Sequence, residues 1–161
     1  MSFNNSLSSI IDSPLWFIIT MIILVPILFL ITKNIWISFL IPYVLLIIGE
    51  TLIFRAVSIE PRLKLEFLWS YKEWSAYWLE IIANIIVFIP LGIMLYKFLG
   101  WKGILISFLF SIGIECVQLI SHRGWFEFDD IFNNSLGSFI GGVLMILFNK
   151  RNRKTTERNY K

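Results

Sequence analysis

Five uninterrupted apolar runs constrain the fold of this chain more than any other feature of its sequence. They lie roughly at residues 14–31, 36–54, 78–96, 103–120 and 131–148. A helix of about 20 apolar residues crosses a hydrocarbon layer about 30 Å thick. Hydrophobic residues make up 57% of the chain and charged residues 16%, whereas soluble domains have about 45–50% and about 25%. The sequence therefore predicts an all-α fold, an integral membrane bundle with about five transmembrane helices.

The polar segments between these runs divide the chain into three predicted parts. Residues 1–54 form an N-terminal transmembrane hairpin, because only a short turn separates the first two runs. Residues 55–148 form a core, in which a segment at 55–77 rich in Trp and Tyr precedes three transmembrane helices. Trp and Tyr favour the headgroup level of a membrane. We expect this segment to lie at the interface and cover the bundle, or simply to form an aromatic belt. Residues 149–161 form a basic tail.

The basic residues predict which ends of the helices face the cytoplasm, because cytoplasmic loops carry an excess of Lys and Arg. With the N-terminus outside, nine of the 14 basic residues would lie inside and five outside. Asp12 precedes the first run and no basic residue precedes Lys33, which favours a retained helix with an exported N-terminus over a secretory signal. We therefore expect the N-terminus outside and the C-terminus in the cytoplasm. The basic tail then anchors to anionic lipid rather than binding nucleic acid.

Polar side chains within the runs gather toward one end of the predicted bundle. These residues are Glu50, Glu80, Asn84, Glu115, Gln118, Asn133 and Asn134. Pairs three or four positions apart, such as Glu80 with Asn84, project from one face of a helix. Lipid cannot satisfy these groups, so we expect the polar stripes to face each other or a water-filled cleft that opens outward. Alternatively they only pack the helices together, as the small pair Gly137 and Gly141 would.

The loop at 121–130 joins two of these striped helices and reads Ser-His-Arg-Gly-Trp-Phe-Glu-Phe-Asp-Asp. Arg123 offers a planar fork of donors that suits phosphate or carboxylate. Asp129 and Asp130 precede a predicted helix, where a carboxylate can cap free N–H groups. Capping accounts for one aspartate, but not for both together with the arginine. The loop is therefore predicted to contribute to ligand binding.

Several motifs together resemble those of the VanZ-like family of bacterial membrane proteins. The third run contains Asn84-Ile-Ile-Val-Phe88-Ile-Pro90-Leu-Gly92, which is similar to the family's Asn-x-x-x-Phe-x-Pro-x-Gly signature. The other matching residues are Arg55, Glu115, Gln118, Arg123, Asp130, Asn134, Gly137 and Gly141. The resemblance covers about residues 52–148, and the first hairpin matches less well.

The resemblance implies a small helical bundle that crosses the bacterial plasma membrane several times. The family is named for a protein that gives low-level resistance to teicoplanin, a lipoglycopeptide that acts on cell-wall precursors outside the membrane. Our leading hypothesis is that an outward cleft engages the anionic headgroup of a lipid-linked or lipid-like molecule and so lowers the effect of lipoglycopeptides. The expected partners are membrane lipids and a lipid-linked cell-wall precursor or a lipoglycopeptide, and no cofactor or metal is expected.

In this hypothesis the two arginines predicted at the outer rim of the cleft, Arg55 and Arg123, hold the anionic group. The polar stripes supply hydrogen bonds from the cleft wall and orient Arg123. The full predicted ligand-binding set is Arg55, Glu80, Asn84, Glu115, Gln118, Arg123, Asp129, Asp130 and Asn134.

Three other functions stay open from the sequence. A membrane enzyme acting on lipid-linked cell-wall intermediates would use carboxylates as acid and base, with Glu80, Glu115 and Asp130 as candidate catalytic residues. Two or three of these carboxylates could also hold a divalent cation. A proton-coupled lipid transporter would need polar groups along the whole bundle, which the inner halves of the helices lack. A structural or partner-binding module is the last of the three.

Overall fold

The computed structural model describes residues 14–57 and 62–159, and five long helices account for most of them. They are α2 (Leu15–Thr32), α3 (Ile35–Ile48) with its continuation η1 (Gly49–Ile53), α5 (Trp74–Leu99), α6 (Trp101–Ser121) and α7 (Phe128–Asn159). Each of the five contains a stretch long and apolar enough to cross a membrane. By length and composition, the predicted all-α membrane bundle is confirmed.

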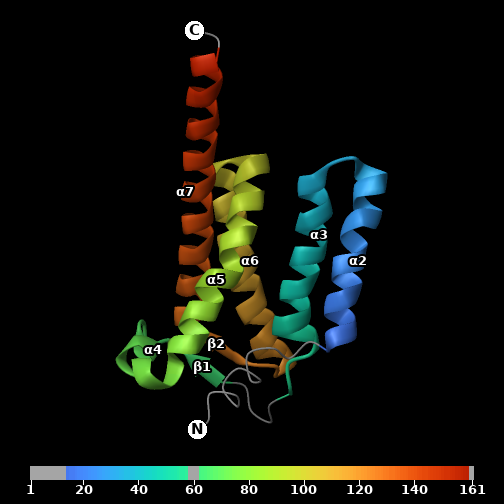
Figure 1. Cartoon of the computed structure of the whole chain (residues 1–161). Helices are drawn as coiled ribbons and strands as arrows, with labels where there is room; N and C mark the ends of the chain where they lie inside the picture. Colours follow the sequence, from blue (N-terminus) through green and yellow to red (C-terminus); the bar gives the residue numbers. More distant parts are fainter. Residues whose placement is uncertain (1–13, 58–61, 160–161) are drawn as a thin grey trace.

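The helices form two groups that lie side by side (Figure 1). In the first group, α5, α6 and α7 pack on one another as a three-helix core, and α2 and α3 form a hairpin beside it. The hairpin turns sharply at Lys33, which has a left-handed φ of 53°. Asn34 then caps α3 by accepting hydrogen bonds from two N–H groups of its first turn. The Tyr43 hydroxyl donates to the Val87 carbonyl at 2.7 Å and ties the hairpin to α5.

Backbone contact between α5 and α7 holds the core together. A Cβ atom added at Gly92, Gly137 or Gly141 would lie 2.2 Å from a backbone carbonyl oxygen of the facing helix. Small residues at helix interfaces allow this close approach. The prediction that Gly137 and Gly141 permit close packing against a neighbouring helix is therefore confirmed. Beside this contact the buried hydroxyls of Ser107 and Ser138 hydrogen-bond at 2.5 Å and join α6 to α7.

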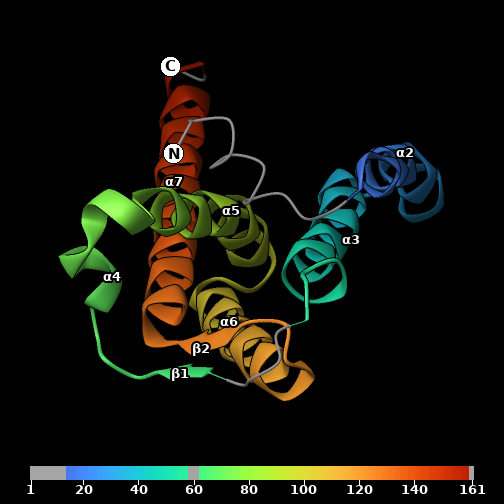
Figure 2. The same cartoon turned by 90° about the horizontal axis from the view of Figure 1, so that it is seen from below.

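Two short strands and a short helix close one end of the bundle, which we call the strand end (Figures 1 and 2). Strand β1 (Arg62–Lys64) pairs in parallel with β2 (Trp125–Glu127), and α4 (Trp69–Lys72) follows β1. The third long helix begins at Trp74, a full turn before the predicted start. The sequence does not predict the strands, because three residues are too few to show a periodic pattern.

The opposite end, which we call the turn end, carries the α2–α3 and α5–α6 turns (Figure 1). Lys33, Lys97 and Lys102 lie in or beside these turns, so the basic residues are divided between the two ends as the topology prediction requires. The direction in which the bundle crosses a membrane stays a prediction. Asp12 and the N-terminus, which is predicted to be exported, lie outside the described residues, as do Lys161 and the side chains of the tail from residue 153 onward.

Replacing Gly141 with alanine should destabilise the core, because its methyl group would collide with the Ile89 carbonyl oxygen. Overpacking of this kind costs about 1–3 kcal/mol. Gly113→Ala is the matched control, since a Cβ there meets no atom within 4 Å and alanine favours a helix over glycine by about 1 kcal/mol. Thermal unfolding of the purified proteins in detergent should give a lower midpoint for Gly141→Ala and a higher one for Gly113→Ala. Equal midpoints would show that the close contact carries no stability.

Candidate functional site

A cavity of about 380 Å³ lies between the hairpin and the three-helix core. Apart from Ile18, its lining residues on the long helices fall within 43–51, 80–88, 114–118 and 130–134. Helices α5 and α7 start at the strand end and α3 and α6 finish there. All four ranges therefore lie in the half of the bundle nearest the strand end. The polar stripes predicted from the sequence meet around one cavity in one half of the bundle.

Two kinds of side chain line this cavity. The apolar lining consists of Ile18, Tyr43, Leu46, Ile47, Ala83, Val87, Phe88 and Ile114. The polar lining consists of Glu50, Thr51, Arg55, Glu80, Asn84, Glu115, Gln118, Glu127, Asp130 and Asn134. Five of these polar residues are carboxylic acids, and the basic side chain among them is Arg55. The cavity is therefore both amphipathic and rich in carboxyl groups.

Hydrogen bonds between elements place the carboxyl groups. The Asn84 amide on α5 donates to the Asp130 carboxyl on α7 at 2.7 Å. Glu115 on α6 is 1% exposed and accepts a hydrogen bond from the backbone N–H of Glu127 in β2 at 2.9 Å. Each contact joins two different elements, and the Asn84–Asp130 contact spans 46 residues of the chain. The packing that closes the strand end therefore also fixes the positions of these acids.

The hairpin contributes to the lining through η1, a π-helical turn at its end. Such turns are rare and are frequently found at functional sites. The turn begins where Gly49 packs against the Phe17 ring, and a Cβ at Gly49 would lie 2.4 Å from a ring carbon. Glu50 and Thr51 follow and both line the cavity. The sequence analysis places Glu50 among the gathered polar residues but outside the predicted ligand-binding set.

Two buried amide side chains at the cavity are only half satisfied. Gln118 donates to the Thr51 carbonyl at 3.1 Å, and Asn134 donates to the Ser111 hydroxyl at 2.9 Å. Their carbonyl oxygens, Oε1 of Gln118 and Oδ1 of Asn134, are buried and accept no hydrogen bond from the described part of the chain. An unpaired buried acceptor costs about 1–3 kcal/mol. Both side chains belong to the cavity lining, so each has an unpaired acceptor buried beside the cavity.

The two arginines predicted at the rim occupy different places. Arg123 does not line the cavity, and its Nη1 donates to the carbonyls of Ile53 at 2.6 Å and Arg55 at 2.9 Å. It thereby holds the backbone where the chain leaves η1. Arg55 does line the cavity, and a Cβ at Gly124 would lie 3.3 Å from both its Nη1 and the Gln118 Cδ. An anionic group in the cavity would therefore meet Arg55, with Arg123 supporting its backbone.

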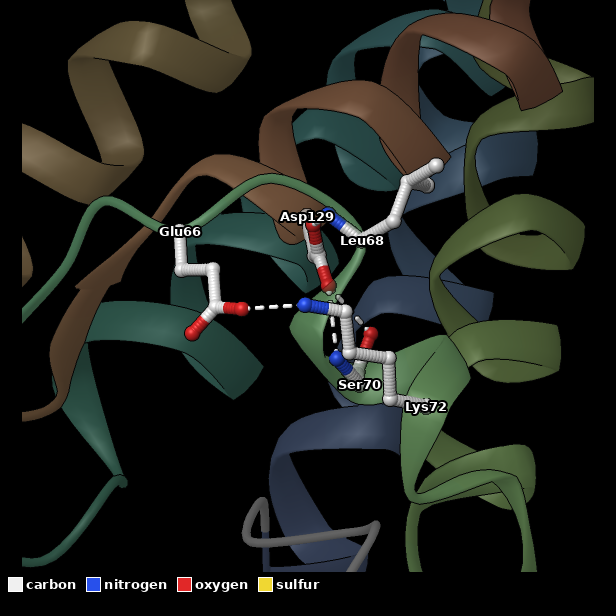
Figure 3. A network of polar contacts seen from close by, with 5 residues as sticks. All are labelled: Glu66, Leu68, Ser70, Lys72 and Asp129. Atoms are coloured by element: carbon white, nitrogen blue, oxygen red, sulfur yellow. Dashed lines mark hydrogen bonds and ion pairs between the residues drawn. The ribbon is translucent and has the colours of Figure 1, made fainter.

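Asp129 also lies away from the cavity lining and anchors the connection that follows β1 (Figure 3). Its fully buried carboxylate accepts hydrogen bonds from the N–H groups of Leu68 at 2.6 Å and Ser70 at 2.9 Å, and from the Ser70 hydroxyl at 2.5 Å. Beside it Lys72 and Glu66 form an exposed ion pair. The sequence predicts a helix cap or a ligand contact at Asp129, and the structure gives it a tertiary contact to a segment 59 residues away in the chain.

Seven of the nine predicted ligand-binding residues line the cavity, and Arg123 and Asp129 do not. The seven are Arg55, Glu80, Asn84, Glu115, Gln118, Asp130 and Asn134. Glu127 was not among the predicted residues, because in the sequence it resembles an ordinary loop charge; the pairing of β2 places it beside Glu115 of α6. The apolar lining was not predicted either, because residues such as Tyr43 do not differ from their apolar neighbours in any pattern.

Glu127 lies outside the membrane-spanning segments and has an unusual proton affinity. Burial, together with the nearby carboxyl groups of Asp130 and Glu80, raises the pKa of Glu127 to about 8, although Arg55 opposes this shift. Desolvation and like charges both disfavour the ionised form of a carboxyl group. Glu127 therefore holds a proton at neutral pH, which reduces repulsion among the acids of the cavity.

The fold and the cavity together define a small helical membrane protein with an acidic cavity in one half of its bundle. The family model described as VanZ/LLP1 matches residues 16–149, and the chain belongs to this family. The match begins within α2. The family resemblance is therefore wider than the stretch of residues 52–148 expected from the motifs, and it includes the hairpin.

A curated relative, Protein VanZ of Enterococcus faecium, is 36% identical over 84 residues. The alignment covers 49% of this chain and 52% of the relative, so the chain spans about half the length of that protein. No solved structure matches the chain.

Replacing Asp129 with asparagine should loosen the connection between β1 and α4. An amide nitrogen would then replace a carboxylate oxygen that faces two N–H groups and a hydroxyl. Hydrogen bonds to charged groups contribute about 1.5–3 kcal/mol each. Ser70→Ala removes one of these contacts and serves as the graded control. Limited proteolysis in detergent should cut the Asp129→Asn variant fastest and Ser70→Ala at an intermediate rate, and parental resistance in both would refute the anchor.

The raised pKa of Glu127 predicts how stability depends on pH. The pKa of this carboxyl group is 4.5 in an unfolded chain and about 8 in the folded protein. Between these values the folded state binds a proton that the unfolded state lacks, so the free energy of unfolding falls as pH rises through this window. Glu127→Gln cannot lose a proton and should lose less stability across the same window in detergent. Glu66→Gln, at an exposed carboxyl whose pKa is lowered by Lys72, should keep the parental slope.

Proposed function

We propose that this chain is a VanZ-like protein of the bacterial plasma membrane that crosses the membrane five times and lowers susceptibility to teicoplanin. We further propose that it does so by engaging the anionic headgroup of a lipid-linked or lipid-like molecule in the cavity. Membership in the VanZ/LLP1 family and the similarity to Protein VanZ support the first part. The shape and chemistry of the cavity support the second.

The observation that carries the proposal is the amphipathic lining of the cavity. Apolar side chains of the hairpin and of α5 face carboxyl, amide and guanidinium groups within one space of about 380 Å³. Ligand pockets in proteins usually enclose about 300–1,000 Å³. This volume suits a polar headgroup and the first part of an apolar chain, and it is too small for a whole lipoglycopeptide. The ligand would therefore bind by its headgroup and leave its bulk in the bilayer.

Arg55 supplies the contact for the anionic group. It is the basic side chain among the lining residues, and guanidinium groups pair well with phosphate or carboxylate. In the predicted topology the strand end faces outward, so the cavity lies on the side of the membrane where lipoglycopeptides act. Arg123 and Asp129 then act indirectly, by holding the chain segments on either side of the site.

A second candidate is an enzyme acting on lipid-linked cell-wall intermediates. The observation that favours it is that Glu80, Glu115 and Asp130 line one cavity together with Glu127. Carboxyl groups in a shared, poorly hydrated site can act as acid and base. Incubation of purified protein with lipid-linked precursors tests this candidate, since a binding protein returns them unchanged.

Replacing Arg55 with glutamine should abolish protection against teicoplanin, because the cavity loses its cation. Lys72→Gln removes one positive charge near the same end of the bundle at an exposed side chain, so it is the matched control and should protect fully. The inhibitory concentration of teicoplanin is measured in cells that hold equal membrane levels of each protein. Full protection by Arg55→Gln would refute the role of the cavity in resistance.

A further inference from the structure

The acidic and basic groups around the cavity do not balance. Its five carboxylic acids are Glu50, Glu80, Glu115, Glu127 and Asp130, and Arg55 is the basic side chain among the residues that line it. A ligand that carried only an anionic group would meet one guanidinium and several carboxyl groups, of which Glu127 is protonated at neutral pH. Like charges in a poorly hydrated site repel strongly. A ligand that fits must therefore also bring hydrogen-bond donors or positive charge.

The buried amides point to the same ligand chemistry independently of the acids. Gln118 and Asn134 are 2% and 4% exposed, and each gives one of its two N–H groups to a protein acceptor. What each leaves unpaired beside the cavity is a carbonyl oxygen. Hydrogen-bond donors must come from the ligand if these oxygens are to be satisfied. Both observations therefore call for hydrogen-bond donors on the ligand.

The geometry around Gly124 places the two kinds of contact next to each other. The Arg55 guanidinium and the Gln118 carboxamide both approach Gly124, each 3.3 Å from where a Cβ would lie. An anionic group on Arg55 would thus lie close to the Gln118 carboxamide. The acids of α5 and α7, Glu80 and Asp130, line the same space. One compact headgroup can reach both the guanidinium and this group of acceptors.

An ammonium group meets these requirements better than a hydroxyl group or a metal ion. It brings three N–H donors and no acceptor, and its positive charge offsets the surplus of carboxyl groups. A hydroxyl group adds an acceptor to a site that already has too many. Among the described residues no three His, Cys, Asp or Glu side chains are arranged to hold a metal ion.

We infer that the cavity selects a zwitterionic headgroup, in which a primary ammonium group lies a few bonds from a single phosphate, as in an aminophospholipid. The phosphate pairs with Arg55, and the ammonium group donates to the acids and to the free oxygens of Gln118 and Asn134. This inference rests on the proposed function in one respect, namely that the cavity is the binding site for a headgroup.

Three phospholipids with identical dioleoyl chains test the inference. Phosphatidylethanolamine carries a phosphate and a primary ammonium, phosphatidylcholine carries a cation without N–H donors, and phosphatidylglycerol carries hydroxyl groups and no cation. Native mass spectrometry of the purified full chain in detergent counts the lipid retained from each. We expect retention of phosphatidylethanolamine at about tenfold lower lipid concentration than the other two, a difference of about 1.4 kcal/mol. Equal retention of all three, or a preference for either of the others, would overturn the inference.

Two variants distinguish the contact of the ammonium group from the contact of the phosphate. Glu80→Gln removes one acidic charge and keeps the side-chain size, so it should weaken retention of phosphatidylethanolamine and spare phosphatidylglycerol. Arg55→Gln should weaken retention of all three lipids, because all carry a phosphate. Retention of phosphatidylglycerol by Glu80→Gln also reports that this variant is folded. Glu66→Gln, which removes an exposed acid of the Lys72 pair, is the control and should behave as the parent.

The two proposals fail in different ways. If all three lipids bind equally and all depend on Arg55, the headgroup site stands and the ammonium preference is wrong. If no lipid depends on Arg55 or Glu80, the cavity is not a headgroup site and the proposed function falls with the inference. A preference for phosphatidylethanolamine that survives Glu80→Gln unchanged would place the ammonium contact elsewhere and overturn the inference.

Discussion

Polar side chains within apolar helices must be satisfied by the protein itself, because the hydrocarbon of a membrane offers them no hydrogen bonds. In this chain that requirement organises one half of the bundle. Asn84 donates to Asp130, Glu115 accepts from the Glu127 backbone, and Gln118 donates to the π-helical turn. Each pair joins two elements, so the contacts that assemble the strand end also determine where the carboxyl groups lie. The cavity is formed by the acids and acceptors that these pairs leave facing one another.

Toward the turn end the bundle depends mainly on close packing, together with the buried hydrogen bond between Ser107 and Ser138. Helices α5 and α7 touch through Gly92, Gly137 and Gly141, where a carbonyl oxygen occupies the place of a side chain. Because the hydrophobic effect does not drive helices together in lipid, such close packing is a main source of helix association. A rigid core of this kind allows the strand end to carry unpaired acceptors, because the position of the helices does not depend on those acceptors being filled.

The helices and the polar half of the bundle were predictable because both follow from local patterns. The first run, at 14–31, corresponds to α2 at Leu15–Thr32 within one residue, and pairs three or four positions apart located the polar face. The roles of Arg123 and Asp129 were not predictable. Their partners lie 68 and 59 residues away in the chain and include backbone groups, which leave no residue-specific signal in the sequence. The pairing of β1 with β2 was not predictable either, because it also joins backbone groups that are far apart in the chain.

The difference between the two halves also bears on transport as a function. A transporter needs a polar path that reaches both ends of the bundle. On α3 and α5 the cavity lining extends toward the turn end only as far as Tyr43 and Phe88. Beyond that point Gly92 and Gly141 keep α5 and α7 in backbone contact. Because the cavity lies between the hairpin and the core, a headgroup moving toward the turn end would have to follow the contact between the hairpin and α5, where the cavity has no polar lining beyond Tyr43 and Phe88. This lack of polar lining supports our proposal of a site that holds a headgroup in one half of the membrane over a path through it.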